Sequence, residues 1–82
     1  MTPKQLYDLR HVMAELGEFT ATELASIMNI PATDIQPQLA TMANEGLLIL
    51  PTAFRYKLVD IDAKLHLLNL NIAYLSQIER GK

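Results

Sequence analysis

Residues 33–44 concentrate amide and hydroxyl side chains, which can donate and accept hydrogen bonds at the edge of a flat ligand such as a base. If this segment is a helix that enters a DNA groove, its outward residues are Thr33, Asp34, Pro37, Ala40, Thr41 and Asn44, flanked by Gln36 and Gln38. Asparagine and glutamine can pair with adenine, and threonine or alanine can contact the methyl group of thymine. The segment contains no lysine or arginine, however, and basic residues supply much of the affinity of most DNA-binding proteins. It therefore fits base recognition and, equally, an uncharged helix that faces solvent or a protein.

The basic residues best suited to hold phosphate groups lie in residues 54–59, where apolar and basic residues alternate. With this alternation Arg55 and Lys57 face the same side of a strand. They can contact a DNA backbone, or they can keep an edge strand from pairing with other chains. The predicted DNA-binding residues are Thr33, Gln36, Pro37, Gln38, Thr41, Asn44, Arg55 and Lys57.

Other site chemistries lack the residues they need. The chain has no cysteine, and its two histidines, His11 and His66, are far apart, with no neighbouring ligand at metal-binding spacing. No glycine-rich phosphate loop or nucleophile motif is present, and Asp60 and Asp62 suit the start of a helix better than catalysis. We expect no enzymatic activity, no cofactor and no metal. The net charge of −2 counts against strong phosphate binding.

The elements that would position these residues begin with a helix over about residues 3–16. Thr2 and Gln5 have the spacing of a capping box, Pro3 suits the first turn, and Gly17 suits the end. One apolar stripe at helical spacing would face the core: Leu6, Leu9, Val12, Met13 and Leu16.

A brief strand over residues 18–20 and two further helices are expected next. Thr20 and Glu23 form a second capping box, and the helix they start must stop before Pro31. Thr33 and Gln36 repeat the spacing for the helix that ends at residues 44–46, and Pro37 is tolerated in or just beyond its first turn.

A hairpin should follow, with strands over residues 47–50 and 54–59 and a break at residues 51–53. Its second strand is expected to turn Phe54, Tyr56 and Leu58 towards the domain and Arg55 and Lys57 towards solvent.

From about Asp62 to Arg80 the helical pattern has two apolar stripes. The first has the 3-4 spacing of a coiled-coil seam and comprises Leu65, Leu68, Ile72 and Leu75; the second comprises Leu67, Leu70, Tyr74 and Ile78. Polar residues occupy the remaining strip. One stripe can pack on the chain's own domain, and we expect the other to pack on a second copy, unless the helix is enclosed in a monomeric core. Asn71 either fixes the register of that contact or lies at its exposed edge. The predicted dimerisation residues are Leu65, Leu67, Leu68, Leu70, Asn71, Ile72, Tyr74, Leu75 and Ile78.

This order of elements is that of the winged-helix form of the helix-turn-helix fold. The segment from Thr20 to Pro31, followed by Ile35, Leu39 and Glu45-Gly46-Leu47-Leu48, resembles the helix-turn-helix and the start of the wing in many bacterial transcriptional regulators. A closer likeness is to the ferrous-iron transport protein C family, in the placement of Leu9-Arg10, Gly17, Asn29, Pro31, Ile35, Leu39, Met42 and Gly46. That family carries a cysteine-rich wing suited to an iron–sulfur cluster. This chain has a short wing without cysteine, so the resemblance implies the fold and not the iron chemistry.

We therefore predict a mainly α fold with a small β-hairpin, comprising a winged-helix domain over residues 1–60 and a C-terminal dimerisation helix over residues 61–82. The resemblance implies a small DNA-binding protein that regulates transcription, with double-stranded DNA as its partner. The two apolar stripes of the C-terminal helix predict a homodimer, and the lack of cysteine and of a long apolar run leads us to expect it in the cytoplasm. The alternative is a winged-helix module that binds another protein and no DNA. An accessory role in metal transport rests on the family likeness alone. No apolar run approaches the length needed to cross a bilayer, so we expect no membrane partner.

Overall fold

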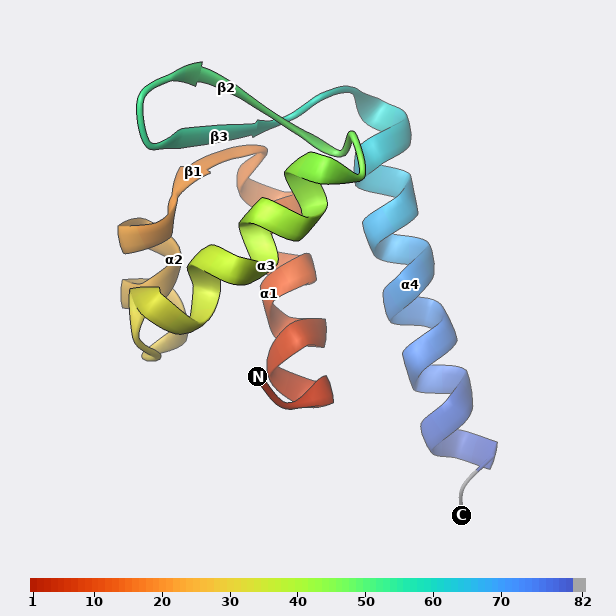
Figure 1. Ribbon diagram of the computed structural model, residues 1–82. Helices are drawn as coiled ribbons and strands as arrows, with labels where there is room; N and C mark the ends of the chain where they lie inside the picture. The colour runs from red at the N-terminus through yellow and green to blue at the C-terminus, as the bar shows by residue number, and fades with distance from the viewer. Residues whose placement is uncertain (81–82) are drawn as a thin grey trace.

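The structure, a computed structural model, describes residues 1–80 (Figure 1). Its elements in chain order are α1 (Pro3–Leu16), β1 (Glu18–Thr20), α2 (Ala21–Met28), α3 (Ala32–Asn44), β2 (Leu48–Thr52), β3 (Arg55–Leu58) and α4 (Ile61–Arg80). The chain is mainly helical, with a small antiparallel sheet and a long C-terminal helix. The predicted fold class is confirmed. Residues 81–82, the last two of the expected C-terminal segment, lie outside the described residues.

Local interactions define both ends of α1. Thr2 Oγ1 accepts a hydrogen bond from the Gln5 N–H (3.1 Å), and Gln5 Oε1 accepts one from the Thr2 N–H (2.9 Å), so the predicted capping box is present. Gly17 ends the helix with φ = 73°, a conformation that glycine adopts without a steric penalty, and its N–H donates to the carbonyl of Met13 (2.9 Å).

The second helix also begins and ends at the predicted residues, but only half of its predicted capping box is present, because the Glu23 carboxylate binds Arg55 instead. Thr20 Oγ1 accepts a hydrogen bond from the Glu23 N–H (3.1 Å) and caps the first turn. Asn29 ends the helix in the left-handed conformation (φ = 57°), which asparagine tolerates better than most residues. The chain then turns through Ile30 towards α3.

The start of α3 differs from the prediction. Its N-cap is Pro31, and no side chain caps the helix, so the capping box expected of Thr33 and Gln36 is wrong. Pro31 (φ = −61°, ψ = 141°) is extended and already aims the chain so that the helix begins at Ala32, which places Thr33 inside the first turn.

Pro37 is the sixth residue of α3, just beyond the first turn, and the helix continues through it. The ring removes the N–H that would have bonded the carbonyl of Thr33, a residue exposed to water. One turn later Thr41 Oγ1 donates a hydrogen bond to the Pro37 carbonyl (3.0 Å).

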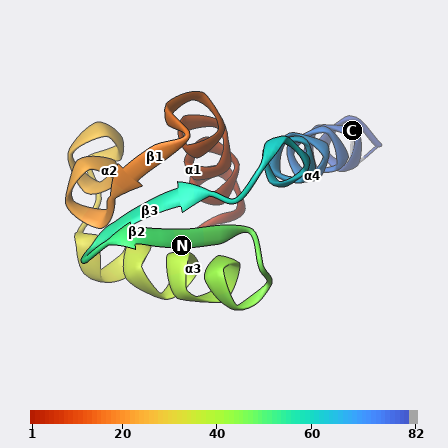
Figure 2. The ribbon, with the colours of Figure 1, turned by 90° about the horizontal axis from the view of Figure 1, so that it is seen from above.

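The sheet has the strand order β1-β3-β2, with both pairs antiparallel. Figure 2 shows β3 between the other two strands, with α4 standing to one side, next to α1. Contrary to the expected break at residues 51–53, β2 continues through Pro51 to Thr52. The sheet accommodates Pro51 because β2 is an edge strand and its register shifts between Ile49 and Thr52, which forms a bulge.

The hairpin turn lies at Ala53 and Phe54, and this changes the position expected of Phe54. Its side chain was expected to face the domain, but it is 83% exposed and its backbone has φ = 67°. The alternation of inward and outward side chains holds only within the strand, where Leu58 is buried and Tyr56 half-buried, and it does not extend into the turn.

The hydrophobic core lies between α1, α2, α3, the sheet and the first half of α4. Its members include Leu9, Met13, Phe19, Leu24, Ile35, Leu39, Met42, Leu48, Leu58, Ala63 and Leu67. Ala63 and Leu67 come from α4, so the first half of that helix shares one core with the winged-helix domain. The second half extends farther than α1 does (Figure 1).

Candidate nucleic-acid interface

The outer face of α3 is a stripe of exposed side chains that runs the length of the helix. It comprises Thr33, Gln36, Pro37, Ala40, Thr41 and Asn44, at the 3-4 spacing of one helix face. The opposite face is anchored in the core by Ile35, Leu39 and Met42. We call this set the α3 stripe. It brings five of the predicted DNA-binding residues together on one surface.

Gln38 does not belong to the α3 stripe. Its side chain is half-buried and lines a hollow between α1, α3 and α4, together with Arg10, Leu6 and Leu70. The proposal that Gln38 contacts DNA therefore lacks the support that the rest of the set receives.

The α3 stripe carries no lysine or arginine, and Asp34 and Glu45 are exposed beside it. Such a surface offers hydrogen bonds and methyl groups to a ligand but no positive charge. From this helix, phosphate groups can receive only neutral hydrogen bonds, and charged phosphate contacts have to come from elsewhere.

Arg55 and Lys57 lie on the face of the sheet that points away from the core, because Tyr56 and Leu58 alternate with them and point inward. The Arg55 guanidinium donates to Glu23 Oε1 (3.0 Å) and lies 3.9 Å from Glu18 Oε1. It joins the sheet to α2, and its charge is matched by two carboxylates.

Lys57 is exposed and lies opposite Glu18 across the strand pair. It lines a hollow with Leu16 and Ile61, near the start of α4. The structure therefore does not bring the two basic wing residues onto the α3 stripe.

A third hollow, of about 610 Å³, lies between the start of α2, the middle of α3 and the wing. Its lining residues include Gln36 and Ala40 from the α3 stripe and Leu50, Phe54 and Tyr56 from the wing. Leu50 is 52% exposed and Phe54 83%, so the wing adds an apolar surface next to the polar helix face. We call this the wing hollow. The sequence prediction missed this hollow because it placed Phe54 in a strand. It took Pro51 as part of a break between the strands, whereas Pro51 lies in the bulge of β2.

The two apolar stripes of α4 face different surroundings. Leu67 is fully buried and Ala63 nearly so against the domain, and Tyr74 packs its ring on Tyr7 of α1, with 5.4 Å between centroids. The other stripe has no such cover: Ile61, Leu65, Ile72 and Leu75 are 63%, 49%, 61% and 45% exposed, and Leu68 is half-buried. We call these five residues the α4 stripe.

The predicted dimerisation residues are thereby divided. Leu65, Leu68, Ile72 and Leu75 lie on the α4 stripe, whereas Leu67 and Asn71 are buried within the chain itself. Leu70 is 37% exposed at the edge of the α1 contact. Ile78 continues the α1-facing side but is 43% exposed, because α1 does not extend so far (Figure 1).

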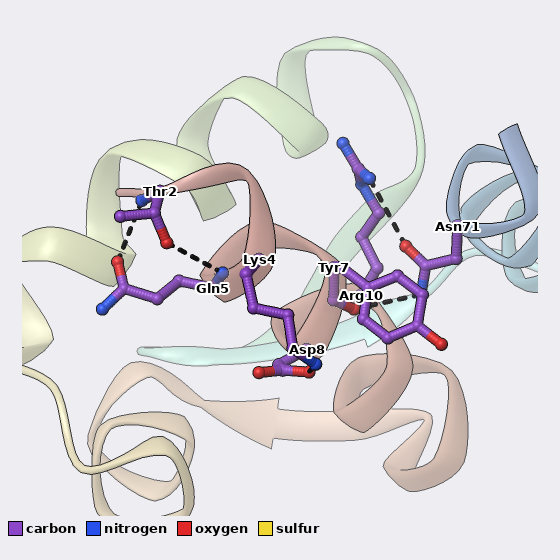
Figure 3. Close-up of polar contacts among 7 residues, drawn as sticks. All are labelled: Thr2, Lys4, Gln5, Tyr7, Asp8, Arg10 and Asn71. Carbon is purple, nitrogen blue, oxygen red and sulfur yellow. Dashed lines mark hydrogen bonds and ion pairs between the residues drawn. The ribbon is translucent and has the colours of Figure 1, made fainter. Parts of the chain in front are cut away.

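Asn71 forms a polar contact between α4 and α1. Its Nδ2 donates to the carbonyl of Tyr7 (3.0 Å), and its Oδ1 accepts from Arg10 Nη1 (3.4 Å), as Figure 3 shows. Partial burial lowers the pKa of the Arg10 guanidinium below its ordinary value. Asn71 therefore fixes the position of α4 on its own domain.

The exposed face of α1 carries two ion pairs between residues one turn apart. Lys4 Nζ lies 2.8 Å from Asp8 Oδ1, and this hydrogen bond raises the pKa of the lysine (Figure 3). His11 Nε2 lies 3.3 Å from Glu15 Oε1.

Within residues 1–80, no three histidine, cysteine or acidic side chains are grouped as a metal ion would require. In the same range no helix combines the length and the apolar character needed to cross a membrane.

Comparison with known proteins connects this fold to one solved structure and not to a sequence family. No family model matches the chain, and no curated protein matches it. The crystal structure of the AntR antimony-specific transcriptional repressor superposes with a TM-score of 0.66 and 23% sequence identity, covering 96% of this chain and 72% of that chain. At this level of identity the likeness shows the fold alone. The chain thus has a winged-helix fold of the kind found in a transcriptional repressor.

Proposed function

We propose that the chain is a homodimeric transcriptional regulator of the cytoplasm, which binds double-stranded DNA with α3 and the wing. The observation that carries the proposal is the α3 stripe, in which a helix anchored by Ile35 and Leu39 presents Gln36, Thr41 and Asn44 on one exposed face. A helix of this kind can lie in the major groove and reach base edges from several turns. The shared fold with a transcriptional repressor supports the same conclusion.

Recognition would depend on amides and methyl groups. Gln36 and Asn44 can each make two hydrogen bonds to adenine, and a good bidentate pair contributes about 1–3 kcal/mol of discrimination against the wrong base. Thr33, Thr41 and Ala40 offer methyl groups to thymine. Lys57 is the wing residue whose charge remains for a phosphate group, because Arg55 is held by Glu18 and Glu23.

This chemistry predicts an unusual dependence on salt. The logarithm of the binding constant falls with the logarithm of salt concentration by about 0.9 for each phosphate that a lysine or arginine neutralises. With few phosphate contacts per copy, we expect a shallow slope and an affinity that depends on two copies binding together.

The test is binding to sheared genomic duplex DNA at about 50 and 200 mM salt, the range over which phosphate contacts are lost. We expect saturable binding that Gln36→Ala together with Asn44→Ala weakens about tenfold or more, since two base contacts disappear. Gln77→Ala replaces an exposed amide on α4; it is the matched control and should leave DNA binding unchanged.

Lys57→Ala should weaken DNA binding modestly and reduce the salt slope. It is a cleaner variant than Arg55→Ala, which also breaks the contact with Glu23. Absence of binding at low salt would overturn the proposal.

A second candidate is a module that binds a protein through the same face. The specific observation in its favour is the wing hollow, where Phe54 and Leu50 expose apolar surface beside the α3 stripe, whose residues carry no charge. Its occupant would be a partner protein that presents a bulky apolar side chain. This function predicts that Phe54→Ala releases a partner that the unchanged chain retains, while DNA binding is absent at every salt concentration.

A further inference from the structure

We infer that the α4 stripe pairs with the α4 stripe of a second copy in antiparallel orientation, so that Leu68 packs on the partner's Ile72 and Leu65 on the partner's Leu75. The inference rests on the homodimer of the proposed function and specifies its geometry. Three features of α4 carry it: the spacing of the stripe, the composition of its two edges, and the charges at its ends.

The spacing of the stripe extends over the whole helix. Ile61, Leu65, Leu68, Ile72 and Leu75 alternate steps of four and three residues, and Glu79 occupies the next position of the same repeat. This is the repeat of a helix packed along another helix. In the antiparallel register the four central positions form apolar layers of one leucine with one leucine or isoleucine, and Glu79 lies level with the partner's Ile61.

The edges of the stripe decide between the two orientations. The edge next to the chain's own α1 carries Lys64, Asn71 and Ile78, and the opposite edge carries the polar residues Asp62, Asn69 and Ser76. In an antiparallel pair related by a two-fold axis, the edge next to α1 lies against the same edge of the partner helix, and the polar edge lies against the partner's polar edge. In a parallel pair, the edge next to α1 of each helix lies against the polar edge of the other. Only the antiparallel pair therefore leaves both polar edges together in solvent.

The same orientation gives Ile78 a partner. In its own chain Ile78 is 43% exposed although it lies on the α1-facing side. In the antiparallel register it lies level with the turn between the partner's Ile61 and the partner's Lys64. That turn borders a hollow of about 410 Å³, whose apolar lining includes Leu16, itself 45% exposed. The parallel pair would place Ile78 beside the partner's Ser76, a polar neighbour.

The charges at the ends of the stripe agree with this register. Glu79 would lie within reach of the partner's Lys64, and the symmetry of the dimer makes this pair twice. In the parallel pair Glu79 would face the partner's Glu79 across the seam, where like charges repel.

Cysteine cross-linking distinguishes the orientations, because the chain has no cysteine of its own. Leu65→Cys and Leu75→Cys are prepared separately, shown to sediment as dimers in reducing buffer, and then oxidised singly and after mixing. We expect covalent dimers from the mixture alone. His66→Cys, on the polar strip, is the control for random oxidation and should stay uncross-linked.

Each alternative outcome has a distinct meaning. Covalent dimers from each variant alone would show a parallel pair and overturn the inference, while the homodimer would stand. A monomeric mass for the unchanged protein would overturn both the inference and the homodimer, and binding of α3 to DNA would still be tested by its own variants.

Charge reversal gives a second measurement. Glu79→Lys and Lys64→Glu should each raise the dimer dissociation constant by roughly twofold to fivefold, as loss of an exposed ion pair does, and the double variant should restore it. A double variant weaker than either single variant would contradict the register.

Discussion

Asn71 shows how a single polar side chain can fix the position of a whole helix. It is 4% exposed, and both ends of its amide have partners on α1: the carbonyl of Tyr7 and the guanidinium of Arg10. A buried amide contributes to stability only while its hydrogen bonds are satisfied, and here they are satisfied by residues more than sixty positions away in sequence.

Replacement of Asn71 should therefore be costly. We expect Asn71→Ala to lower the free energy of unfolding by about 1–3 kcal/mol, because two hydrogen bonds and a packed side chain are lost. The measurement is chemical denaturation followed by circular dichroism. Asn69→Ala, on the exposed strip of the same helix, is the matched control and should change the free energy by less than about 0.5 kcal/mol. Equal effects of the two variants would mean that the contact with α1 contributes nothing.

Phe54 presents the opposite case, a large apolar side chain that the fold does not bury. Its backbone lies in the left-handed region (φ = 67°), which costs a residue with a side chain about 1–2 kcal/mol relative to glycine. Backbone strain of this kind clusters at functional sites, and 83% exposure leaves the ring accessible to a partner.

Glycine at this position should accordingly not harm the fold. We expect Phe54→Gly to leave the free energy of unfolding unchanged or to raise it by up to about 1 kcal/mol, since relief of strain offsets the greater freedom of the unfolded chain. Ala53→Gly, in the same turn but without a positive φ, should lower it by about 0.5–1 kcal/mol. Thermal denaturation of both variants tests this. A loss of more than 1 kcal/mol in Phe54→Gly would show that the ring packs in solution.

Among the elements, α2 and α3 have similar sequence signals at their starts and different structures there. Thr20 caps α2 through a hydrogen bond to the Glu23 N–H, whereas Thr33 lies within α3 behind Pro31. The spacing of threonine and a following Glu or Gln is the same in both, so spacing alone could not separate them. Pro31 makes the difference, because its fixed φ allows the helix to begin at Ala32, one residue before Thr33.

The difference between the two threonines can be measured. We expect Thr20→Ala to lower the free energy of unfolding by about 1 kcal/mol, the usual effect of losing an N-cap side chain. Thr33→Ala should change it by less than about 0.5 kcal/mol, and alanine could even favour the helix slightly. Comparable losses in both variants, measured by urea denaturation, would mean that Thr33 caps α3 in solution.

At the scale of the whole molecule, the domain buries only one of the two apolar stripes of its C-terminal helix. Half of the residues are hydrophobic, and the domain uses one side of α4 to complete its core. The α4 stripe remains, with Ile61 and Ile72 each more than 60% exposed. An apolar stripe of this length marks an interaction surface, and the partner proposed for it is a second copy.

The interface should be removable without unfolding the domain. Leu68→Glu together with Leu75→Glu places two charges on the α4 stripe and leaves the α1 contact through Leu67 and Asn71 intact. We expect a monomeric mass in analytical ultracentrifugation, a helical circular dichroism spectrum, and lower stability than that of the dimer. His66→Glu, on the polar strip, is the matched control and should remain dimeric. An unchanged mass for the double variant would rule out this stripe as the dimer contact.

The sequence by itself determined the elements and the order in which they follow. Capping residues, glycine and proline act on neighbours within a few positions, so the starts and ends of α1 and α2 were predicted correctly from Thr2, Gly17, Thr20 and Pro31. The 3-4 spacing also identified which residues of α3 share its exposed face, apart from Gln38.

Only the tertiary structure decided which of these surfaces remain available. Contacts between segments far apart in sequence determine which stripe of α4 packs on α1 and pair Arg55 with Glu23. The bulge in β2 moves the hairpin turn and so exposes Phe54. Periodicity assigns a residue to a face of its element but not to the neighbour that this face will meet. That choice follows from how the elements together bury the most apolar surface, a property of the folded chain as a whole.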